Sequence, residues 1–370
     1  MSPFTEKLKE GDEEVATLVP SSAAANVQEM VRMDPSQVPE RYLIIDQNQQ
    51  DMPKIADLSH LSSQIPIIDL SSLTKENKEE LIKLDLACKD WGFFQIINHG
   101  VAREVLQGMK DVAAKFFDLP LEEKNKIPLP SNDVQGYGRE FAVPGQTLDW
   151  SDALLLFVHP ANSVNFTLWP KKPSEFKETV QAYSSEVKRV AKELLGSLSL
   201  IMGMEKQSLL EIMNKDFTQL FRLSYYPPCC MPDKVVGLSP HSDIGTLTIL
   251  MQEDHVNGLQ IRHQGIWVPV NPIPNSLIVN IGDMIEIWSN GKYKSIEHRV
   301  VTNDSKPRIS CATFISPFVD VEVQPLDHMV DLQGGFPPMY KKVRYGDYRL
   351  QSLKRKLERK TQLKTAKGES

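Results

Sequence analysis

The sequence predicts an α+β protein whose core is a jelly roll, also called a double-stranded β-helix, flanked by helices. The first indication is a series of short segments after residue 217 that are rich in β-branched and aromatic residues and separated by turn formers. The second is a long segment, 175–202, with an apolar stripe at helical spacing. Short strands in such a series are typical of two facing sheets that enclose a cavity.

The segment before the long helix is predicted to hold a polar arm and then strands alternating with helices. Residues 1–63 are polar and irregular, apart from a short helical candidate at 27–33 and an extended stretch at 38–42. Strands are predicted at 65–70 and 91–100, because both are short apolar runs bounded by turn formers. The helices predicted here, from the spacing of their apolar residues, are 76–90, 103–117 and a short turn at 120–124.

Residues 128–150 show neither the helical nor the strand period and are predicted to be a loop. Its glycine-flanked aromatic centre could reach over a pocket mouth, or it could be an ordinary surface hairpin. Beyond the long helix, eight segments are predicted to be strands. They are 222–226, 246–251, 258–262, 266–270, 276–281, 284–288, 294–301 and 308–315. One or two helices are expected from 339 onward. The chain thus divides into an arm (1–63), an N-terminal region (64–170), a long supporting helix (171–215), the jelly roll (216–320) and a C-terminal helical segment with a basic tail (321–370).

Composition narrows the classes of function. A net charge of -6 argues against binding to a nucleic-acid backbone, and no apolar run approaches the roughly 20 residues that span a bilayer. The N-terminal residues lack the basic start and apolar core of a secretory signal. The four cysteines (Cys88, Cys229, Cys230 and Cys311) have no CxxC spacing and are typical of reduced thiols. We therefore expect a cytoplasmic protein with small-molecule partners and neither nucleic-acid nor membrane partners.

Three residues of the β-rich part form a candidate metal site. His241 and Asp243 are two residues apart, so on an extended segment their side chains point to the same side. Of the eight histidines, His298 is the one in the middle of a predicted strand of this part. The strongest competitor, His99, lies at a strand end and is expected to be structural. Two histidines and one carboxylate that leave positions open are the ligand set of non-haem Fe(II) oxygenases.

A second pair with the same spacing is Arg308 and Ser310. The guanidinium of arginine is a fork of donors that suits a carboxylate, and a buried arginine is costly unless an anion meets it. A dicarboxylic cosubstrate could bind the metal with one end and Arg308 with the other; pairing of Arg308 with a protein acid is the alternative. Tyr226, just before two prolines, could add a hydroxyl.

Several motifs together resemble the plant 2-oxoglutarate/Fe(II)-dependent dioxygenases, over residues 38–350. The motifs are Ile65-Pro66-Ile67-Ile68-Asp69-Leu70, Asp90-Trp91-Gly92-Phe93-Phe94-Gln95-Ile96-Ile97-Asn98-His99-Gly100-Val101, Tyr225-Tyr226-Pro227-Pro228, His-x-Asp, the later His and Arg-x-Ser. In its overall sequence pattern the chain resembles most the group of senescence-related proteins, alkaloid O-demethylases and the lateral branching oxidoreductase. The resemblance implies that His241, Asp243 and His298 bind Fe(II). It also implies that Arg308 and Ser310 bind the distal carboxylate of 2-oxoglutarate, assisted by Tyr226.

One position departs from the family pattern. Members usually carry Asn two residues before the second tyrosine, where it contacts the cosubstrate, and here that position is Ser224. A serine side chain is shorter and offers one donor. We expect Ser224 to take the place of this asparagine as a residue of the 2-oxoglutarate site.

The resemblance implies that O2 and 2-oxoglutarate are consumed, that succinate and CO2 are formed, and that ascorbate supports the activity. The organic substrate is hydroxylated, or is demethylated where the attacked carbon bears oxygen or nitrogen. The residues expected to line the substrate pocket are Tyr137, Phe141, Phe314 and Phe318, and the alternative for each of them is packing in the core. Aromatic walls suit a small, largely apolar metabolite such as an alkaloid, phenolic or terpenoid. Two alternatives stay open at this point: an oxidase of the same fold that does not use 2-oxoglutarate, and a non-catalytic jelly roll that binds a small molecule.

Overall fold

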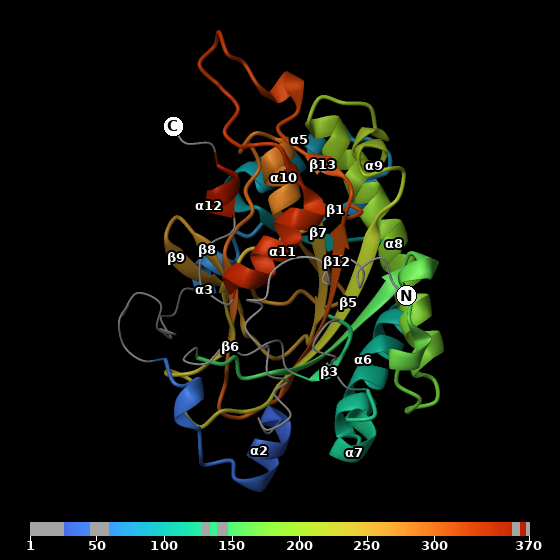
Figure 1. Ribbon diagram of the computed structural model, residues 1–370, viewed down its shortest axis with the longest axis vertical. Coiled ribbons are helices and arrows are strands. Elements are labelled where there is room, and N and C mark those ends of the chain that lie inside the picture. Colours follow the sequence, from blue (N-terminus) through green and yellow to red (C-terminus); the bar gives the residue numbers. More distant parts are fainter. Residues whose placement is uncertain (1–25, 45–58, 128–133, 139–146, 357–362, 368–370) are drawn as a thin grey trace, which may run out of the picture.

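Two β-sheets form the centre of the protein. The computed structural model describes residues 26–44, 59–127, 134–138, 147–356 and 363–367 (Figure 1). The larger sheet has the strand order β1-β2-β10-β7-β12-β5-β4-β3, and the smaller sheet has the order β6-β11-β8-β9. Apolar side chains of both sheets, such as Phe93 and Ile278 of the larger and Ile261 and Val268 of the smaller, pack in one cluster between them. This arrangement is the predicted jelly roll.

The strands have the following bounds. They are β1 Ile67–Asp69, β2 Phe93–Ile97, β3 Gly136–Gly138, β4 Asp152–His159, β5 Thr218–Tyr226, β6 Val236–His241, β7 Leu247–Gln252, β8 Leu259–His263, β9 Ile266–Pro269, β10 Leu277–Ile281, β11 His298–Val301, β12 Arg308–Ser316, β13 Glu322–Val323 and β14 Val343–Arg344. The last two form a separate small sheet. Strands β3, β4, β6, β13 and β14 were not predicted, and β3 lies within the segment predicted to be a loop. Strand β11 begins four residues later than expected, at His298 itself.

The α-helices within the described residues are α2 Val27–Met33, α3 Ser59–Ser62, α4 Leu70–Leu73, α5 Lys78–Leu86, α6 Arg103–Asp118, α7 Leu121–Lys124, α8 Phe176–Ile201, α9 Ser208–Ile212, α10 Asp283–Trp288, α11 Tyr345–Lys356 and α12 Leu363–Ala366. The predictions at 27–33, 103–117 and 175–202 are confirmed within one residue at each end. None of the described helices combines the length and the apolar character needed to cross a bilayer.

Helices α6 and α8 cover the outer face of the larger sheet (Figure 1). The apolar stripe of α8 is buried along its whole length, for example at Val180, Val187 and Leu194, against strand residues such as Leu156 and Phe221. Strands from the predicted N-terminal region, β1 to β4, lie in the same sheet as strands of the predicted jelly-roll segment. The other face of this sheet is therefore the one that looks into the jelly roll.

The strand predicted at 284–288 is wrong, because this segment forms helix α10. Asp283 and Glu286 are three residues apart, which is a helical spacing, but the rest of this short segment is apolar, and a short apolar run does not distinguish a strand from a buried helix. The capping residue, Gly282, lies so close to the backbone of Gly245 that a Cβ at Gly282 would lie 2.3 Å from that carbonyl oxygen. Glycine at 282 thus lets α10 start directly beneath the loop that follows Asp243.

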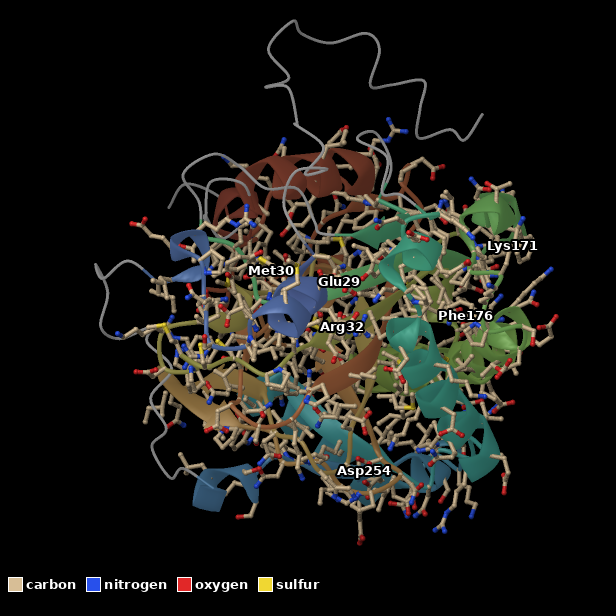
Figure 2. The ribbon with its side chains drawn as sticks, turned by 90° about the horizontal axis from the view of Figure 1, so that it is seen from below. Glu29, Met30, Arg32, Lys171, Phe176 and Asp254 are labelled. Carbon is tan, nitrogen blue, oxygen red and sulfur yellow. The ribbon has the colours of Figure 1, made fainter. Side chains whose placement is uncertain are left out.

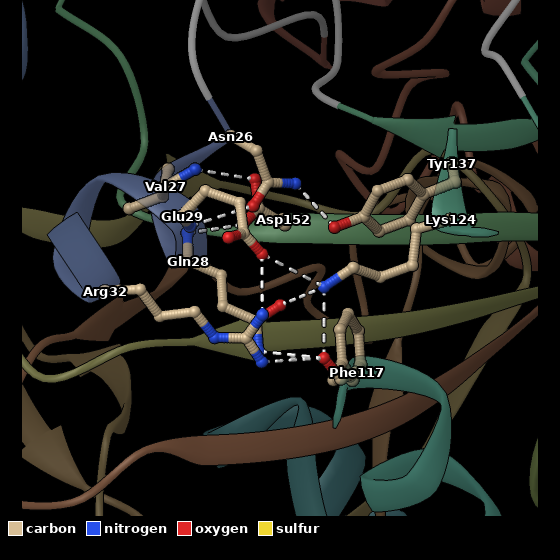
Figure 3. A network of polar contacts seen from close by, with 9 residues as sticks. All are labelled: Asn26, Val27, Gln28, Glu29, Arg32, Phe117, Lys124, Tyr137 and Asp152. Carbon is tan, nitrogen blue, oxygen red and sulfur yellow. Dashed lines mark hydrogen bonds and ion pairs between the residues drawn. The ribbon is translucent and has the colours of Figure 1, made fainter. Parts of the chain in front are cut away.

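The N-terminal helix α2 is bound to strand β4 through a buried carboxylate. The backbone N–H groups of Val27 and Gln28 donate to the two carboxylate oxygens of Asp152, at 3.0 and 2.8 Å (Figure 3). Asp152 is the first residue of β4 and pairs with Tyr225 of β5. In Figure 2, which shows the protein from below, helix α2 lies in the middle of the view and is marked by the label of its residue Glu29.

A buried lysine reinforces this contact. Lys124, at the end of α7, is completely buried and donates to Gln28 Oε1 and to the carbonyl oxygen of Phe117 (Figure 3). Burial lowers the pKa of Lys124, and Arg32 lowers it further, whereas Glu29, whose carboxylate lies 3.6 Å from the ammonium, raises it. The predicted arm is therefore not wholly irregular: its helical part is attached to the sheet beside Tyr225.

Candidate metal centre and cosubstrate site

The two predicted histidine ligands face each other across the smaller sheet. His241 ends β6, His298 begins β11, and the two are directly paired in the register of these antiparallel strands. Their ring centroids are 4.2 Å apart. The Nδ1 atoms lie 2.9 Å from the carbonyl oxygen of Ser239 and 3.2 Å from that of Ile296. A histidine whose Nδ1–H donates to a carbonyl presents Nε2 as the free ligand atom.

Asp243 completes this group. Its carboxylate oxygens lie 3.6 Å from His241 Nε2 and 3.8 Å from His298 Nε2, and one ligand atom from each of the three residues falls within 4.8 Å of the others. Strand β6 ends at His241, so Asp243 lies two residues beyond the strand. The common direction of the two side chains nevertheless holds.

The carboxylate of Asp243 is held by two donors from the larger sheet. Thr248 Oγ1 and Asn280 Nδ2, from β7 and β10, both donate to its Oδ2 atom, the latter at 2.8 Å. Burial alone would raise the pKa of Asp243, but the neighbouring His298 and His241, together with these two hydrogen bonds, hold it below its usual value. The aspartate is thus kept ionised and oriented, which is the form that binds a metal.

The imidazole of His298 is also kept in the form that binds a metal. It is buried, with the ring of Phe93 packed edge-on at 5.3 Å. Burial lowers the pKa of His298 to about 4, with a further lowering by His241, although Asp243 acts in the opposite direction. A neutral imidazole, a neighbouring imidazole and an ionised carboxylate form a donor set that fits Fe(II).

The predicted cosubstrate residues lie together on two paired strands. Arg308 pairs with Tyr226, and Ser310 pairs with Ser224, in the register of β12 and β5. All four are buried. The guanidinium of Arg308 lies 5.3 Å from the centre of the Tyr226 ring. Strand alternation directs these side chains to the face opposite the helices, since the intervening residues Ile309 and Tyr225 pack against the apolar cluster that includes α6 and α8.

Arg308 has an incomplete set of partners. Its Nη2 donates to Gln252 Oε1 at 2.7 Å, while Nε and Nη1 have no hydrogen-bond partner among the described residues. Burial lowers the pKa of Arg308, whereas Tyr226 and Glu253 raise it. The guanidinium remains charged, because the pKa of arginine starts above 12. Two free donors of a buried cation fit the carboxylate of a bound acid.

The hydroxyl of Ser224 is engaged within the protein. It accepts a hydrogen bond of 3.0 Å from Nε of Arg222, two residues earlier on the same face of β5. Sequence reasoning had not singled out Arg222, nor Thr248, Asn280 and Gln252. The alternation of the predicted strands at 246–251 and 276–281 placed Thr248 and Asn280 on definite faces, but did not identify the strand that lies opposite them.

The predicted pocket residues have different positions. The prediction that Tyr137 lines the pocket is wrong. Its ring packs edge-on against Phe116 of α6 at 5.6 Å, and its hydroxyl accepts a hydrogen bond from Asn26 (Figure 3). It pairs with Leu154 on β4, whose side chain also belongs to the helix-covered cluster. Phe314 is half-buried and alternates with Ser310 along β12, so it lies on the face that looks into the jelly roll.

Two aromatic candidates, Phe141 and Phe318, and the histidine competitor His99 remain to be considered. Phe141 falls outside the described residues. Phe318 lies beyond the end of β12 and packs against the main apolar cluster. His99 is buried, with Nε2 2.9 Å from the carbonyl oxygen of Asn275, which agrees with the structural role expected for it.

Comparisons with known proteins show the family of this chain. Residues 217–317 match the model of the 2OG-Fe(II) oxygenase superfamily, and residues 65–172 match that of the non-haem dioxygenase in morphine synthesis N-terminal region. Lateral branching oxidoreductase 1 of Arabidopsis thaliana is 44% identical over 92% of this chain and 95% of its own length. Thebaine 6-O-demethylase of Papaver somniferum is 36% identical over 91% and 94%.

A solved structure extends the agreement to the fold. The crystal structure of JOX2 in complex with 2OG, Fe and JA matches 93% of this chain and 98% of its own, with a TM-score of 0.83 and 33% sequence identity. The jelly roll, the paired histidines with their aspartate, and the buried arginine with two free donor atoms are thus found in a chain that is similar to a protein solved in complex with 2OG, Fe and JA. The chain belongs to the 2OG-Fe(II) oxygenase superfamily and is a 2-oxoglutarate- and Fe(II)-dependent dioxygenase.

Proposed function

We propose that His241, Asp243 and His298 bind the Fe(II) ion of this enzyme, and that Arg308 with Ser310 binds the distal carboxylate of 2-oxoglutarate. One observation carries this assignment. The ligand atoms of His241, Asp243 and His298 lie within 4.8 Å of one another, and the same interior of the jelly roll holds the buried guanidinium of Arg308, two of whose donor atoms are free. A protein acid paired with Arg308 was the alternative, and no ion pair of Arg308 occurs among the described residues.

Each residue then has a definite task. The imidazoles of His241 and His298 and the carboxylate of Asp243 leave positions open for the cosubstrate and O2. When bound, Fe(II) supplies the activation of O2, and ascorbate supports the activity. Arg308 and Ser310 orient the acid from its far end, with Tyr226 beside the guanidinium. The nearly complete burial of Arg308 and Asp243 keeps water away from the reacting groups.

The organic substrate is proposed to be a small, largely apolar plant metabolite, such as an alkaloid, phenolic or terpenoid, that is hydroxylated or O- or N-demethylated. The relatives include an oxoglutarate-dependent flavonoid 7-O-demethylase and a codeine O-demethylase, at 39% and 35% identity. Phe314, and Phe157 on the same face of the larger sheet, supply aromatic surface in the interior. Such surface favours flat, apolar molecules.

Succinate and CO2 release, measured with and without 2-oxoglutarate, tests the cosubstrate. A panel of methoxylated and unsubstituted alkaloids, flavonoids and terpenoids then tests the substrate class, with mass spectrometry to detect a gained oxygen or a lost methyl group. Oxidation without 2-oxoglutarate would contradict the proposed cosubstrate site. Turnover of polar compounds alone would contradict the proposed substrate class.

We also propose a cytoplasmic location. All four cysteines are free thiols, and three of them are buried, whereas Cys230 is exposed. An exposed free thiol is typical of a reducing compartment. Cell fractionation with an antibody against the protein tests this location, and recovery in a secreted or organellar fraction would overturn it.

A further inference from the structure

Strand β7 supports both ends of the proposed site. Its side chains alternate, so Thr248 and Gln252 point into the jelly roll, whereas Ile249 and Met251 belong to the helix-covered cluster. Thr248 donates to the carboxylate of Asp243. Four residues along the strand, Gln252 accepts from Arg308. One strand therefore orients a residue at the metal end and a residue at the cosubstrate end.

Gln252 and Arg308 form a group of donors that lacks an acceptor. Gln252 is 8% exposed and Arg308 1%. Once the bond from Arg308 Nη2 to Gln252 Oε1 is made, three donor atoms, Arg308 Nε, Arg308 Nη1 and Gln252 Nε2, have no hydrogen-bond partner among the described residues. Register pairing also places Gln252 directly beside Ser310. Buried donors without acceptors are rare in folded proteins and indicate a missing acceptor.

The chemistry of glutamine explains why it suits this position. Its carbonyl oxygen fixes one arm of the guanidinium fork without adding a negative charge, so the full charge of Arg308 remains available to an incoming anion. A glutamate of nearly the same shape would give a stronger hydrogen bond and would compensate the buried charge. The charge of Arg308 would then be compensated within the ligand-free protein, but the carboxylate of the glutamate would compete with the carboxylate of the ligand.

We propose that Gln252 is a positioning residue for 2-oxoglutarate, which holds Arg308 in the orientation that receives the distal carboxylate while leaving its charge uncompensated. This inference rests on the proposed role of Arg308. It predicts that Gln252→Glu separates two properties that usually change together, since it stabilises the ligand-free protein and weakens binding of the acid.

The test measures 2-oxoglutarate binding to the Mn(II)-loaded protein without O2, by isothermal titration calorimetry, and the unfolding temperature of the metal-free and ligand-free protein. Four variants are compared with the wild type: Gln252→Leu, Gln252→Glu, Arg308→Leu and the double variant Gln252→Leu/Arg308→Leu. We expect Gln252→Leu to weaken binding about tenfold, as for the loss of one hydrogen bond to a charged group. Gln252→Glu is expected to weaken it about 100-fold and to raise the unfolding temperature.

A second glutamine–arginine pair provides a matched control. Arg299 is as buried as Arg308, and its Nε donates to Gln260 Oε1 at 2.8 Å, but Arg299 also lies 4.2 Å from the ring centre of Trp267. Because His298 points inward, Arg299 points to the outer side of β11. Gln260→Glu makes the same chemical change there and is expected to leave 2-oxoglutarate affinity within about twofold of the wild type.

The variants distinguish the inference from the proposed function beneath it. If Gln252 acts through Arg308, adding Gln252→Leu to Arg308→Leu causes no further loss of affinity. An additional loss in the double variant would overturn the positioning role. Wild-type affinity in both Gln252 variants, with affinity lost in Arg308→Leu, would overturn the inference and leave the proposed function intact. Wild-type affinity in Arg308→Leu would overturn both. Equal Mn(II) affinity in all variants shows that the metal end is preserved.

Discussion

The two ends of the proposed site differ in how completely the protein satisfies its own charges. At the metal end, Asp243 accepts from Thr248 and Asn280 and lies between two imidazoles. At the cosubstrate end, Arg308 has one hydrogen bond, to a neutral glutamine, and two free donor atoms. Both groups are almost fully buried.

This difference indicates what each end does before its ligand binds. The metal end is oriented in advance by neighbours that hold a carboxylate in one position, which favours a fixed coordination geometry. The cosubstrate end keeps a buried charge short of partners, and each unsatisfied group costs on the order of 1–3 kcal/mol of stability. Binding of an acid recovers that free energy. A substitution at the metal end should therefore lower both the stability of the protein and its affinity for the metal. A substitution at the cosubstrate end should lower the affinity for the acid while the stability of the ligand-free protein stays the same or rises.

The largest effect is expected when a ligand of the metal end is removed. Asp243→Ala should reduce Mn(II) affinity and succinate formation by more than about 1000-fold, beyond the 10–100-fold typical of residues that only support a ligand. Titration of Mn(II) and chromatographic measurement of succinate check this. Asp304→Ala, at an exposed position, serves as the control. Turnover at the wild-type rate in Asp243→Ala would show that the metal lies elsewhere.

At the opposite end, Arg308→Leu should separate stability from binding. The loss of two hydrogen bonds between charged groups, worth about 3–6 kcal/mol, predicts at least a 100-fold weaker affinity for 2-oxoglutarate. Removal of a buried, uncompensated charge should leave the unfolding temperature of the ligand-free protein unchanged or higher. Calorimetric titration and thermal unfolding measure the two quantities.

The contrasting variant is Arg299→Leu. Arg299 is equally buried but has partners in Gln260 and Trp267. Its replacement should lower the unfolding temperature and leave 2-oxoglutarate affinity unchanged. If Arg308→Leu destabilises the ligand-free protein as much as Arg299→Leu does, the two arginines are equivalent, and the contrast between the ends of the site is wrong.

The sequence predicted the residues of each end better than their surroundings. Spacing of two residues placed Arg308 and Ser310 on one face of a strand, and the structure confirms that placement. The same spacing placed His241 and Asp243 on one side, although Asp243 proved to lie just beyond β6. The two residues of each pair are close in the chain, so the alternation of side chains along an extended segment is enough to predict that they point to the same side.

The supporting residues could not be predicted, because they depend on contacts between segments far apart in the chain. Gln252 and Arg308 are 56 residues apart, and only the adjacency of β7 and β12 brings them together. Tyr137 was assigned to the wrong side for the same reason, since its direction follows from pairing with the unpredicted strand β4. The helix at 283–288 was missed because a short and mostly apolar segment does not distinguish a buried helix from a strand.

A smaller effect is expected when one support of the metal end is removed. Asn280→Leu deletes a donor to Asp243 while keeping the volume, and Thr248 remains as the second donor. We expect Mn(II) affinity, measured without 2-oxoglutarate, to fall by about 10–100-fold, because supporting residues of a metal ligand contribute on that scale. The unfolding temperature should fall too, since Asp243 loses a partner. Weaker metal binding combined with higher stability would contradict the parallel response expected at this end.

The smallest effect is expected from crowding Arg308 without changing its charge. A Cβ added at Gly258 would lie 2.9 Å from Arg308 Cδ and 3.2 Å from the carbonyl oxygen of Val301, so Gly258→Ala must shift the arginine side chain. Displacement of this kind costs about 1–3 kcal/mol, which predicts about tenfold weaker 2-oxoglutarate binding and unchanged Mn(II) affinity. Gly108→Ala is the control, since its Cβ would meet nothing closer than 3.8 Å. Unchanged 2-oxoglutarate affinity in Gly258→Ala would mean that the acid tolerates a displaced guanidinium, and that the charge of Arg308 matters more than the orientation in which Gln252 holds it.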